Sequence, residues 1–106
     1  MKIYIAGPYS SNPEKNMKIA EEIGVQILKR GHIPFIPHKH TFGWEKRNDV
    51  TYEDFLRLDF AWLECCDALF FIGRSLGADR ELEHSKKLNI PVYYKIDDIP
   101  KDTEER

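Results

Sequence analysis

The chain has 106 residues, of which 42% are hydrophobic and 32% charged, and this balance is typical of one globular domain rather than of a disordered chain. Its formal net charge of -2 gives no general attraction to nucleic acid or to an anionic membrane. No apolar run approaches the roughly 20 residues that span a bilayer, and the run 3–6 is too short for a signal peptide, so we expect a cytoplasmic protein with no nucleic-acid or membrane partner.

The first predicted elements are a strand over residues 2–6 and a helix that ends near Arg30. The strand residues are rich in β-formers, and a Gly-Pro turn signal follows them. Ser11 offers a hydroxyl N-cap, and a proline in the first turn and a glutamate three positions after the serine complete a capping box. Apolar residues then recur at helical spacing until a glycine closes the helix. We therefore expect a tight loop over 7–11 at the carboxyl end of the first strand.

A second strand is predicted over residues 32–37, where two prolines cannot donate to a ladder and so favour an edge position. Residues 38–49 have no clear period, and we predict a loop of about a dozen residues, a length at which a functional role becomes a reasonable suspicion. His38 is a candidate for lining a substrate pocket. It and a second histidine two positions later would supply only two metal ligands, so we expect no metal site. Trp44 and Phe42 either stack on a base or cap the core, and the pattern does not choose between them.

Two further helices and two further strands follow. Apolar residues at helical spacing predict a helix over 51–65, and a short apolar run predicts a third strand over 68–72. A helix is predicted over 79–88 and a fourth strand over 92–94. The charged residues 97–106 are expected to form a tail that is frayed or loosely helical.

Strands and helices alternate along the chain, which implies a mostly parallel sheet covered on both faces by helices. We predict one α/β domain over residues 1–106, with three layers and a four-stranded, mainly parallel sheet of the flavodoxin or Rossmann-like kind. Right-handed crossovers and the proline-rich second strand favour the strand order 2-1-3-4. Because strands one and three are then neighbours, the loops 7–11 and 73–81 line a common crevice, which is where ligands bind in open α/β sheets.

The stretch 75–81, Ser-Leu-Gly-Ala-Asp-Arg-Glu, joins the third strand to the next helix. A turn there leaves backbone N–H groups pointing out of the first helical turn, which suits an oxyanion. It also places Glu81 in or near that turn, beside the carboxyl end of the strand. An ordinary strand-to-helix loop, whose glutamate only complements the helix dipole, explains the same residues equally well.

A wider pattern links this stretch to the preceding helix. Residues 5–9 read Ile-Ala-Gly-Pro-Tyr. The later part of the chain reads Asp59-x-x-Trp62-Leu63-x-x-x-Asp67, a strand, and then Ser75-x-Gly77-x-x-x-Glu81-Leu82. In these motifs the chain resembles the nucleoside 2-deoxyribosyltransferase-like superfamily, including its deoxynucleoside monophosphate N-glycosidase branch. The resemblance covers roughly residues 2–94.

The resemblance implies an enzyme that cleaves or transfers the N-glycosidic bond of a nucleoside or nucleotide. It implies that Glu81 is the nucleophile, that Asp59 activates or protonates the base, and that Tyr4 supports them. The residues facing the sugar 5′ end or its phosphate would be Gly7, Pro8, Tyr9, Ser10, Ser75 and Gly77. No cofactor is expected, the partner would be a nucleoside or nucleotide, and a homodimer or larger homo-oligomer would complete the pocket.

Physical chemistry makes these roles reasonable. Breaking an N-glycosidic bond builds oxocarbenium character at the anomeric carbon, where a carboxylate on the opposite face can form a covalent glycosyl intermediate. A second carboxyl group can supply the proton that the leaving base needs. The two groups need different protonation states. We expect Glu81, near a helix N-terminus, to be ionised, and Asp59, on a helix face that also carries Trp62, to be partly desolvated.

The resemblance leaves the activity open in two respects. The phosphate-binding branch usually has an arginine in the first loop, where this chain reads Tyr9-Ser10-Ser11, and this departure puts recognition of a 5′-phosphate in doubt. Water as the acceptor would give a hydrolase and a second base would give a transferase, and nothing in the sequence decides between them. The competing interpretation is a nucleotide-binding or regulatory module that has kept the crevice without turnover.

Overall fold

A parallel sheet lies at the centre of the computed structural model, which describes residues 1–101. The sheet has four strands in the order β2-β1-β3-β4, and every neighbouring pair is parallel. The predicted fold class and strand order are confirmed, including the edge position of the proline-containing strand. The strands are β1 (Lys2–Ala6), β2 (Ile33–Phe35), β3 (Ala68–Phe71) and β4 (Val92–Tyr93).

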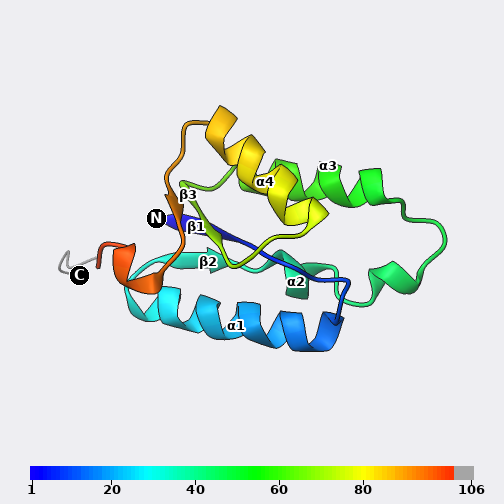
Figure 1. The fold of residues 1–106 in the computed structure, drawn as a ribbon, viewed down its shortest axis with the longest axis horizontal. Helices are drawn as coiled ribbons and strands as arrows, with labels where there is room; N and C mark the ends of the chain where they lie inside the picture. The colour runs from blue at the N-terminus through cyan, green and yellow to red at the C-terminus, as the bar shows by residue number, and fades with distance from the viewer. Residues whose placement is uncertain (102–106) are drawn as a thin grey trace.

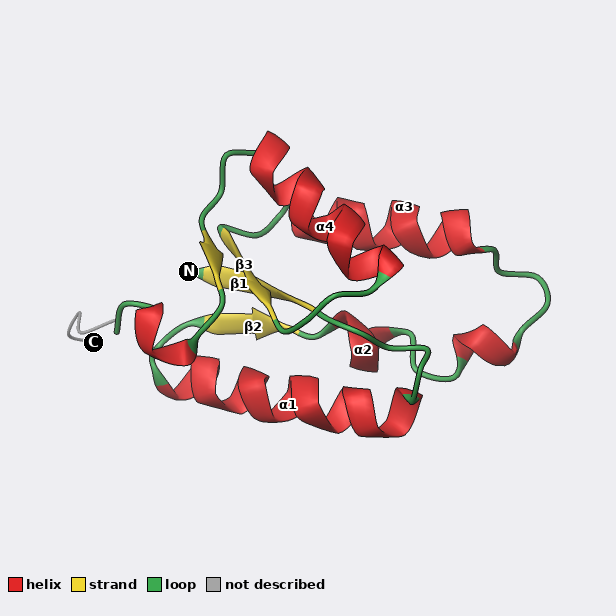
Figure 2. Ribbon diagram, in the orientation of Figure 1, coloured by secondary structure: helices red, strands yellow, loops and turns green. Residues whose placement is uncertain are grey.

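Helices cover both faces of the sheet, which gives three layers (Figure 1, Figure 2). The first helix lies along one face, and the third and fourth lie side by side on the other (Figure 1). The helices are α1 (Pro13–Lys29), α2 (Pro37–His40), α3 (Tyr52–Leu63) and α4 (Leu76–Lys87), with two 3-10 turns, η1 (Trp44–Lys46) and η2 (Ile96–Asp98). Within residues 1–101, no helix has the length and apolar content needed to cross a bilayer.

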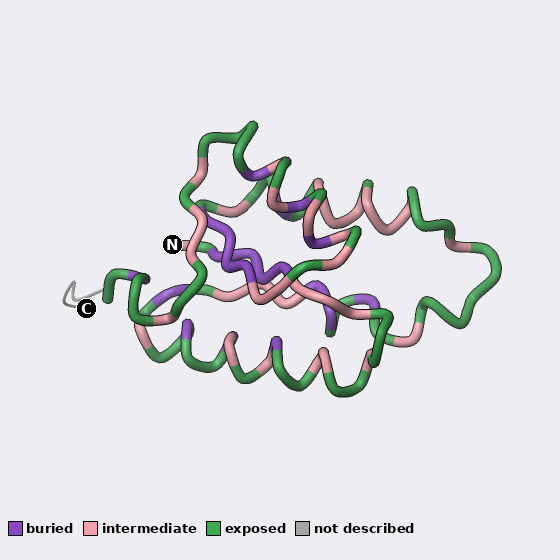
Figure 3. The backbone as a smooth tube through the Cα atoms, in the orientation of Figure 1, coloured by how far each residue is buried: buried purple, intermediate pink, exposed green. Residues whose placement is uncertain are grey.

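β1 divides the core into two parts because its side chains alternate between the two faces of the sheet. Ile3 and Ile5 belong to the cluster on the α1 side, together with Ile27 of that helix. Tyr4 and Ala6 belong to the other cluster, with residues of α3 and α4. These strand residues are fully buried, and Figure 3 shows the same burial along the centre of the sheet. The second cluster therefore places a tyrosine hydroxyl under the α3–α4 pair.

The N-cap of α1 is Asn12 and not Ser11. The Asn12 side-chain oxygen accepts a hydrogen bond from the Lys15 backbone N–H (3.3 Å), whereas the Ser11 hydroxyl accepts one from the Asn16 side-chain amide (3.0 Å). Pro13 then occupies the first helical position, where a missing N–H is not felt. The predicted capping box is therefore wrong by one residue, because Asn and Ser are nearly equivalent caps and the local pattern does not separate them.

Residues 38–49 are more ordered than the predicted loop. Pro37 starts α2, and η1 follows Gly43, whose φ of 89° lies in the left-handed region that glycine adopts readily. The Thr51 hydroxyl and the Asp54 carboxylate then form a capping box at the start of α3. Single helical turns have no apolar period of their own, so the pattern along the chain does not reveal them.

α4 begins at Leu76, three residues earlier than predicted. Ser75 is its N-cap and accepts a hydrogen bond from the Ala78 backbone N–H (3.1 Å). Gly77, which suggested a turn, lies inside the first helical turn instead. Glu81 therefore occupies the second turn of α4 rather than the first, and this changes the electrostatic surroundings of its carboxyl group.

The end of the described chain packs against the core. Ile99 is fully buried in the cluster on the α1 side. The Arg30 guanidinium donates two hydrogen bonds to the Ile99 carbonyl oxygen (3.1 and 2.8 Å). Of the two forms predicted for the tail 97–106, frayed or loosely helical, the helical one fits residues 97–98, which belong to η2, and the burial of Ile99 contradicts fraying there. Residues 102–106 lie outside the described part of the chain.

Two glycines give opposite predictions for stability. A Cβ added at Gly7 would lie 2.9 Å from the Cβ of Ile72, so we expect Gly7→Ala to lower the free energy of unfolding by about 1–3 kcal/mol. At Gly77 the nearest atom is the Tyr52 hydroxyl at 3.9 Å, and Gly77→Ala is expected to raise the free energy of unfolding by about 0.5 kcal/mol, because alanine favours the helix. Urea unfolding of both proteins checks the pair. A stabilised Gly7→Ala protein would contradict the close approach of Gly7 to Ile72.

Candidate active site

Three side chains from separate elements meet above the middle of the sheet. Tyr4 comes from β1, Asp59 from α3 and Glu81 from α4. The Tyr4 hydroxyl donates a hydrogen bond to Glu81 Oε2 at 2.7 Å, and both residues are buried, Glu81 being only 6% exposed. The half-buried Asp59 carboxyl lies within hydrogen-bonding reach of the Glu81 carboxyl. The folded chain thus brings together the three residues that were predicted to carry the chemistry.

The two carboxyl groups hold protons more tightly than carboxyl groups in water. Burial, and then the nearby charge of Asp59, raises the pKa of Glu81 to about 8, although the Tyr4 hydrogen bond acts in the opposite direction. Burial also raises the pKa of Asp59 to about 6, against the effect of its hydrogen bond with Glu81. Because two like charges this close disfavour double ionisation, the pair titrates as a unit and holds one proton near neutral pH.

The expectation that a helix N-terminus keeps Glu81 ionised is wrong. Glu81 lies in the second turn of α4, past the unpaired N–H groups of the first turn, and it is buried more deeply than Asp59. Desolvation therefore outweighs the helix dipole and raises the pKa of Glu81. The raised pKa of Glu81 and the raised pKa of Asp59 have the same main cause, burial, so both groups favour the protonated form.

Tyr4 positions Glu81 and also makes it more acidic than burial alone would. Burial, followed by the charge of Glu81, raises the pKa of Tyr4 well above its usual value, so the phenol stays protonated and donates. We expect Tyr4→Phe to raise the pKa of Glu81, because the donor that stabilises the carboxylate is lost, and to lower stability by about 1 kcal/mol. Carbon-detected NMR titration of the carboxyl groups measures the shift, with the exposed Tyr94→Phe as the control. An unchanged Glu81 titration in Tyr4→Phe would contradict this role.

The first loop lies against the loop that follows β3, as predicted from the strand order. A Cβ at Gly7 would contact Ile72, and a Cβ at Gly73 would lie 3.8 Å from Pro8. Ser10 is exposed in the same loop. The carboxyl ends of β1 and β3 therefore present one continuous loop surface.

Tyr9 is already engaged by the segment that follows α2. Its hydroxyl donates a hydrogen bond to Glu45 Oε1 (2.8 Å) and accepts one from the Gly43 N–H (3.4 Å). Burial, followed by the hydrogen bond to Glu45, raises the pKa of Tyr9 to about 12. Tyr9 thus ties the first loop to η1, and its predicted contact with the substrate stays a prediction.

His38 is buried beneath the first loop, with 6% of its surface exposed. Its Nε2 donates a hydrogen bond to the Pro8 carbonyl oxygen (3.0 Å), and its Nδ1 has no hydrogen-bond partner among residues 1–101. Burial lowers the pKa of His38, so the ring is neutral at physiological pH. The geometry gives His38 a part in supporting the loop, and its predicted part in lining a pocket is untested.

Ser75 and Gly77 lie at the start of α4, at one end of the α3–α4 pair. The Ser75 hydroxyl is occupied as an acceptor by the cap of the helix. Gly77 faces the Tyr52 hydroxyl of α3, and the Arg80 guanidinium lies over the Tyr52 ring, 5.4 Å from its centre. Arg80 thus places a positive charge at this end of the α3–α4 helix pair. The first loop, residues 7–11, has no arginine.

A stack of aromatic rings, which the sequence pattern did not single out, adjoins the carboxyl pair. Phe35 pairs with Tyr4 in the β1–β2 register, and their ring centres lie 5.7 Å apart. Phe35 also stacks on Trp62 of α3 (4.9 Å, interplanar angle 20°), and His40 lies edge-on to Trp62 (5.7 Å). One feature of the sequence did point to an aromatic ring beside the carboxyl pair: Asp59 and Trp62 are three residues apart, which puts both on one face of a helix.

Trp44 and Phe42 do not cap the core. They are 41% and 43% exposed, and the Trp44 ring lies 6.5 Å from the ring of His40. Their exposure argues against the core-capping role, and the exposure by itself does not assign either ring to a ligand.

Comparison with known proteins gives a family and a fold. A family model described as a domain of unknown function, DUF7768, matches residues 1–95. The chain belongs to this family. A comparison with the curated proteins finds no match.

Solved structures of two 2-deoxyribosyltransferases share the fold of this DUF7768 chain. The enzyme from the psychrotolerant bacterium Bacillus psychrosaccharolyticus is 23% identical, with a TM-score of 0.68, over 87% of this chain and 69% of that one. The enzyme from Leishmania mexicana is 19% identical, with a TM-score of 0.63, over 86% of this chain and 61% of that one, so the chain spans less than two thirds of its length. The fold is therefore nucleoside 2-deoxyribosyltransferase-like, as the resemblance predicted.

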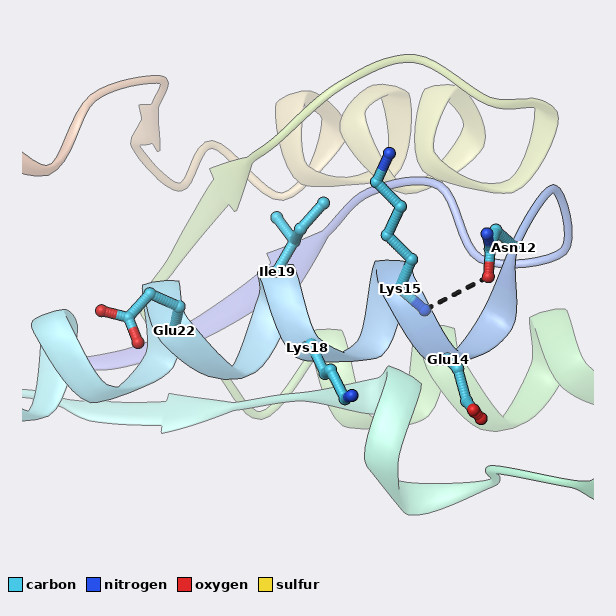
Figure 4. Close-up of a pocket in the computed structure, with 6 residues that line it drawn as sticks. All are labelled: Asn12, Glu14, Lys15, Lys18, Ile19 and Glu22. Carbon is cyan, nitrogen blue, oxygen red and sulfur yellow. Dashed lines mark hydrogen bonds between the residues drawn. The ribbon is translucent and has the colours of Figure 1, made fainter.

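Two hollows on the described surface lie away from the carboxyl pair. One is an open groove of about 520 Å³ on α1, where Figure 4 shows Lys15 and Ile19 on one side of the helix and Lys18 and Glu14 on the other. The second, of about 370 Å³, includes Arg74 and other residues of β3 and α4. Neither hollow is bordered by the predicted catalytic residues, so the predicted crevice between the loops 7–11 and 73–81 is not one of these two.

The described residues contain no ready metal centre. Within residues 1–101, no group of three or more His, Cys, Asp or Glu side chains is placed to hold a metal ion. His38 hydrogen-bonds to Pro8, while His40 packs against aromatic rings. The two histidines, although they are two residues apart in sequence, therefore have separate surroundings.

Proposed function

We propose that the protein cleaves the N-glycosidic bond of a nucleoside or nucleoside monophosphate through a covalent glycosyl intermediate on Glu81. The observation that carries this proposal is the pair of neighbouring carboxyl groups, the half-buried Asp59 of α3 and the buried Glu81 of α4, which is hydrogen-bonded to Tyr4. Burying two carboxyl groups side by side costs stability, so their presence calls for a functional reason. Perturbed pKa values of this kind concentrate at functional sites. The shared fold with 2-deoxyribosyltransferases supports the same substrate class.

The chemistry uses the single proton of the pair. When the sugar binds, the proton passes to Asp59 and leaves Glu81 as a carboxylate directed at the anomeric carbon. Asp59 donates the proton to the departing base while the bond from the anomeric carbon to the base nitrogen breaks and an ester bond to Glu81 forms. Water or a second base then attacks the same carbon, breaks the ester and returns its proton to Asp59. Water gives a hydrolase, and a second base gives a deoxyribosyltransferase.

A second candidate function is a binding or regulatory module without turnover. One observation favours it: the two hollows described above lie away from the carboxyl pair. Completion of the pocket by a second copy of the chain, which the resemblance implies, would account for the same observation while preserving catalysis. Size-exclusion chromatography with light scattering measures whether such an oligomer forms.

Product analysis separates the two functions. The protein is incubated with each common 2′-deoxynucleoside and with each 5′-monophosphate, with and without a second base, and the mixtures are resolved by liquid chromatography. Release of free base supports the proposal, and formation of a new nucleoside identifies a transferase. Calorimetry on the same ligands runs in parallel. Binding without any product would support the module, and neither binding nor product would reject both functions.

A further inference from the structure

We propose that Trp62 is the residue on which the substrate's base stacks. This inference deepens the proposed function and rests on it, because it assigns the aromatic surface beside the carboxyl pair to a planar heteroaromatic ring. The pair acts on the bond between a sugar and a base, so the base must lie next to the proton donor, Asp59. The base should therefore stack on an exposed aromatic ring beside Asp59.

Trp62 follows Asp59 by three residues in α3, so both side chains lie on one face of that helix. Phe35 connects this face to the other two members of the site. Its ring lies 4.9 Å from Trp62 and 5.7 Å from Tyr4, whose hydroxyl binds Glu81. A chain of contacts through Phe35 and Tyr4 thus connects the indole to the carboxyl pair.

The indole of Trp62 is held in place yet remains open to a ligand. Phe35 stacks against it at an interplanar angle of 20°, and His40 meets it edge-on at 5.7 Å. These contacts fix the orientation of the ring, while Trp62 keeps 40% of its surface exposed. A large aromatic ring that is fixed on some sides and open on another is suited to stacking, which tolerates any base because every base has a π-face.

Trp44 is the competing candidate and also the matched control. It is exposed to nearly the same extent, 41%, but it belongs to η1, and its ring lies 6.5 Å from the ring of His40, which in turn meets Trp62. The chain has two tryptophans, so Trp44→Phe leaves Trp62 as the sole indole fluorophore and Trp62→Phe leaves Trp44. Each tryptophan can therefore be followed separately.

The experiment is a fluorescence titration in the Glu81→Gln background, which prevents turnover. The probes are thymidine and 2′-deoxyadenosine, and excitation at the red edge of the indole band limits absorption by the base. We expect saturable quenching in the protein that keeps Trp62 and none in the protein that keeps Trp44. Quenching confined to Trp44, or no quenching at either position, would overturn the inference.

Kinetics on the active protein give an independent measurement. We expect Trp62→Leu to raise KM by about 10-fold or more, Trp62→Phe to raise it by less, since a phenyl ring still stacks, and Trp44→Phe to leave it unchanged. A thermal melt establishes that Trp62→Leu is folded. Turnover with an unchanged KM in Trp62→Leu would overturn the inference and leave the proposed function standing. Quenching at Trp62 with no product from the unmodified protein would overturn the proposed function and leave the stacking of a base on Trp62 standing.

Discussion

Replacing Glu81 by glutamine is expected to lower the rate of base release by at least about 10³-fold, because an amide is a far poorer nucleophile toward an anomeric carbon than a carboxylate. The protein should nevertheless fold, since glutamine has the same shape and can still accept the hydrogen bond that Tyr4 donates. Single-turnover chromatography measures base release. Intact mass spectrometry of the unmodified protein with a slowly reacting 2′-fluoro nucleoside should show a glycosyl adduct that Glu81→Gln lacks.

The control for this substitution is Glu83→Gln. Glu83 lies two residues further along α4, is exposed, and makes only a long contact to Lys87 (3.9 Å). Its replacement makes the same chemical change on the same helix and should leave turnover at the level of the unmodified protein. Full activity in Glu81→Gln would reject the proposed nucleophile. An equal loss in both variants would point to the helix rather than to the carboxyl group.

The stability of the unmodified protein is expected to fall as the pH rises from about 5 to about 8. The pKa of Glu81 is raised in the folded state, so the folded chain binds this proton more tightly than the unfolded chain. The contribution of this proton to the free energy of unfolding is therefore complete below the pKa of Glu81 in the unfolded chain. It is lost as the pH rises through the pKa of Glu81 in the folded chain. The expected loss is on the order of 3 kcal/mol, and urea unfolding at a series of pH values measures it.

Glu81→Gln removes one of the two titrating carboxyl groups and should reduce this dependence to the part that Asp59 contributes, whereas Glu83→Gln should keep all of it. His38 acts in the opposite direction, because its lowered pKa costs stability as the pH falls, but it is present in all three proteins and cancels from the differences. At pH 8 we expect Glu81→Gln to be more stable than the unmodified protein. Equal slopes in Glu81→Gln and the unmodified protein would show that burial does not raise the pKa of Glu81.

Periodicity and turn signals along the chain were sufficient for the architecture, and the motifs of the resembled superfamily picked out the three candidate residues that the fold brings together. Alternating strand and helix patterns, together with two prolines in one strand, predicted the order 2-1-3-4. These signals are local, and handedness rules convert them into a topology. The family spacing of Asp59 and Glu81, with one strand between them, then placed both carboxyl groups over Tyr4.

Packing between distant segments decided the remainder. The protonation of Glu81 depends on desolvation by β1 and α3, and no local motif encodes desolvation. The aromatic stack joins Phe35 to Trp62 through a strand register and a helix face, and Ile99 is buried by residues far from it in sequence. Short helical turns and cap positions are decided by differences of about 1 kcal/mol between nearly equivalent residues. Such differences, and the dielectric around a buried carboxyl group, exist only once the chain has folded.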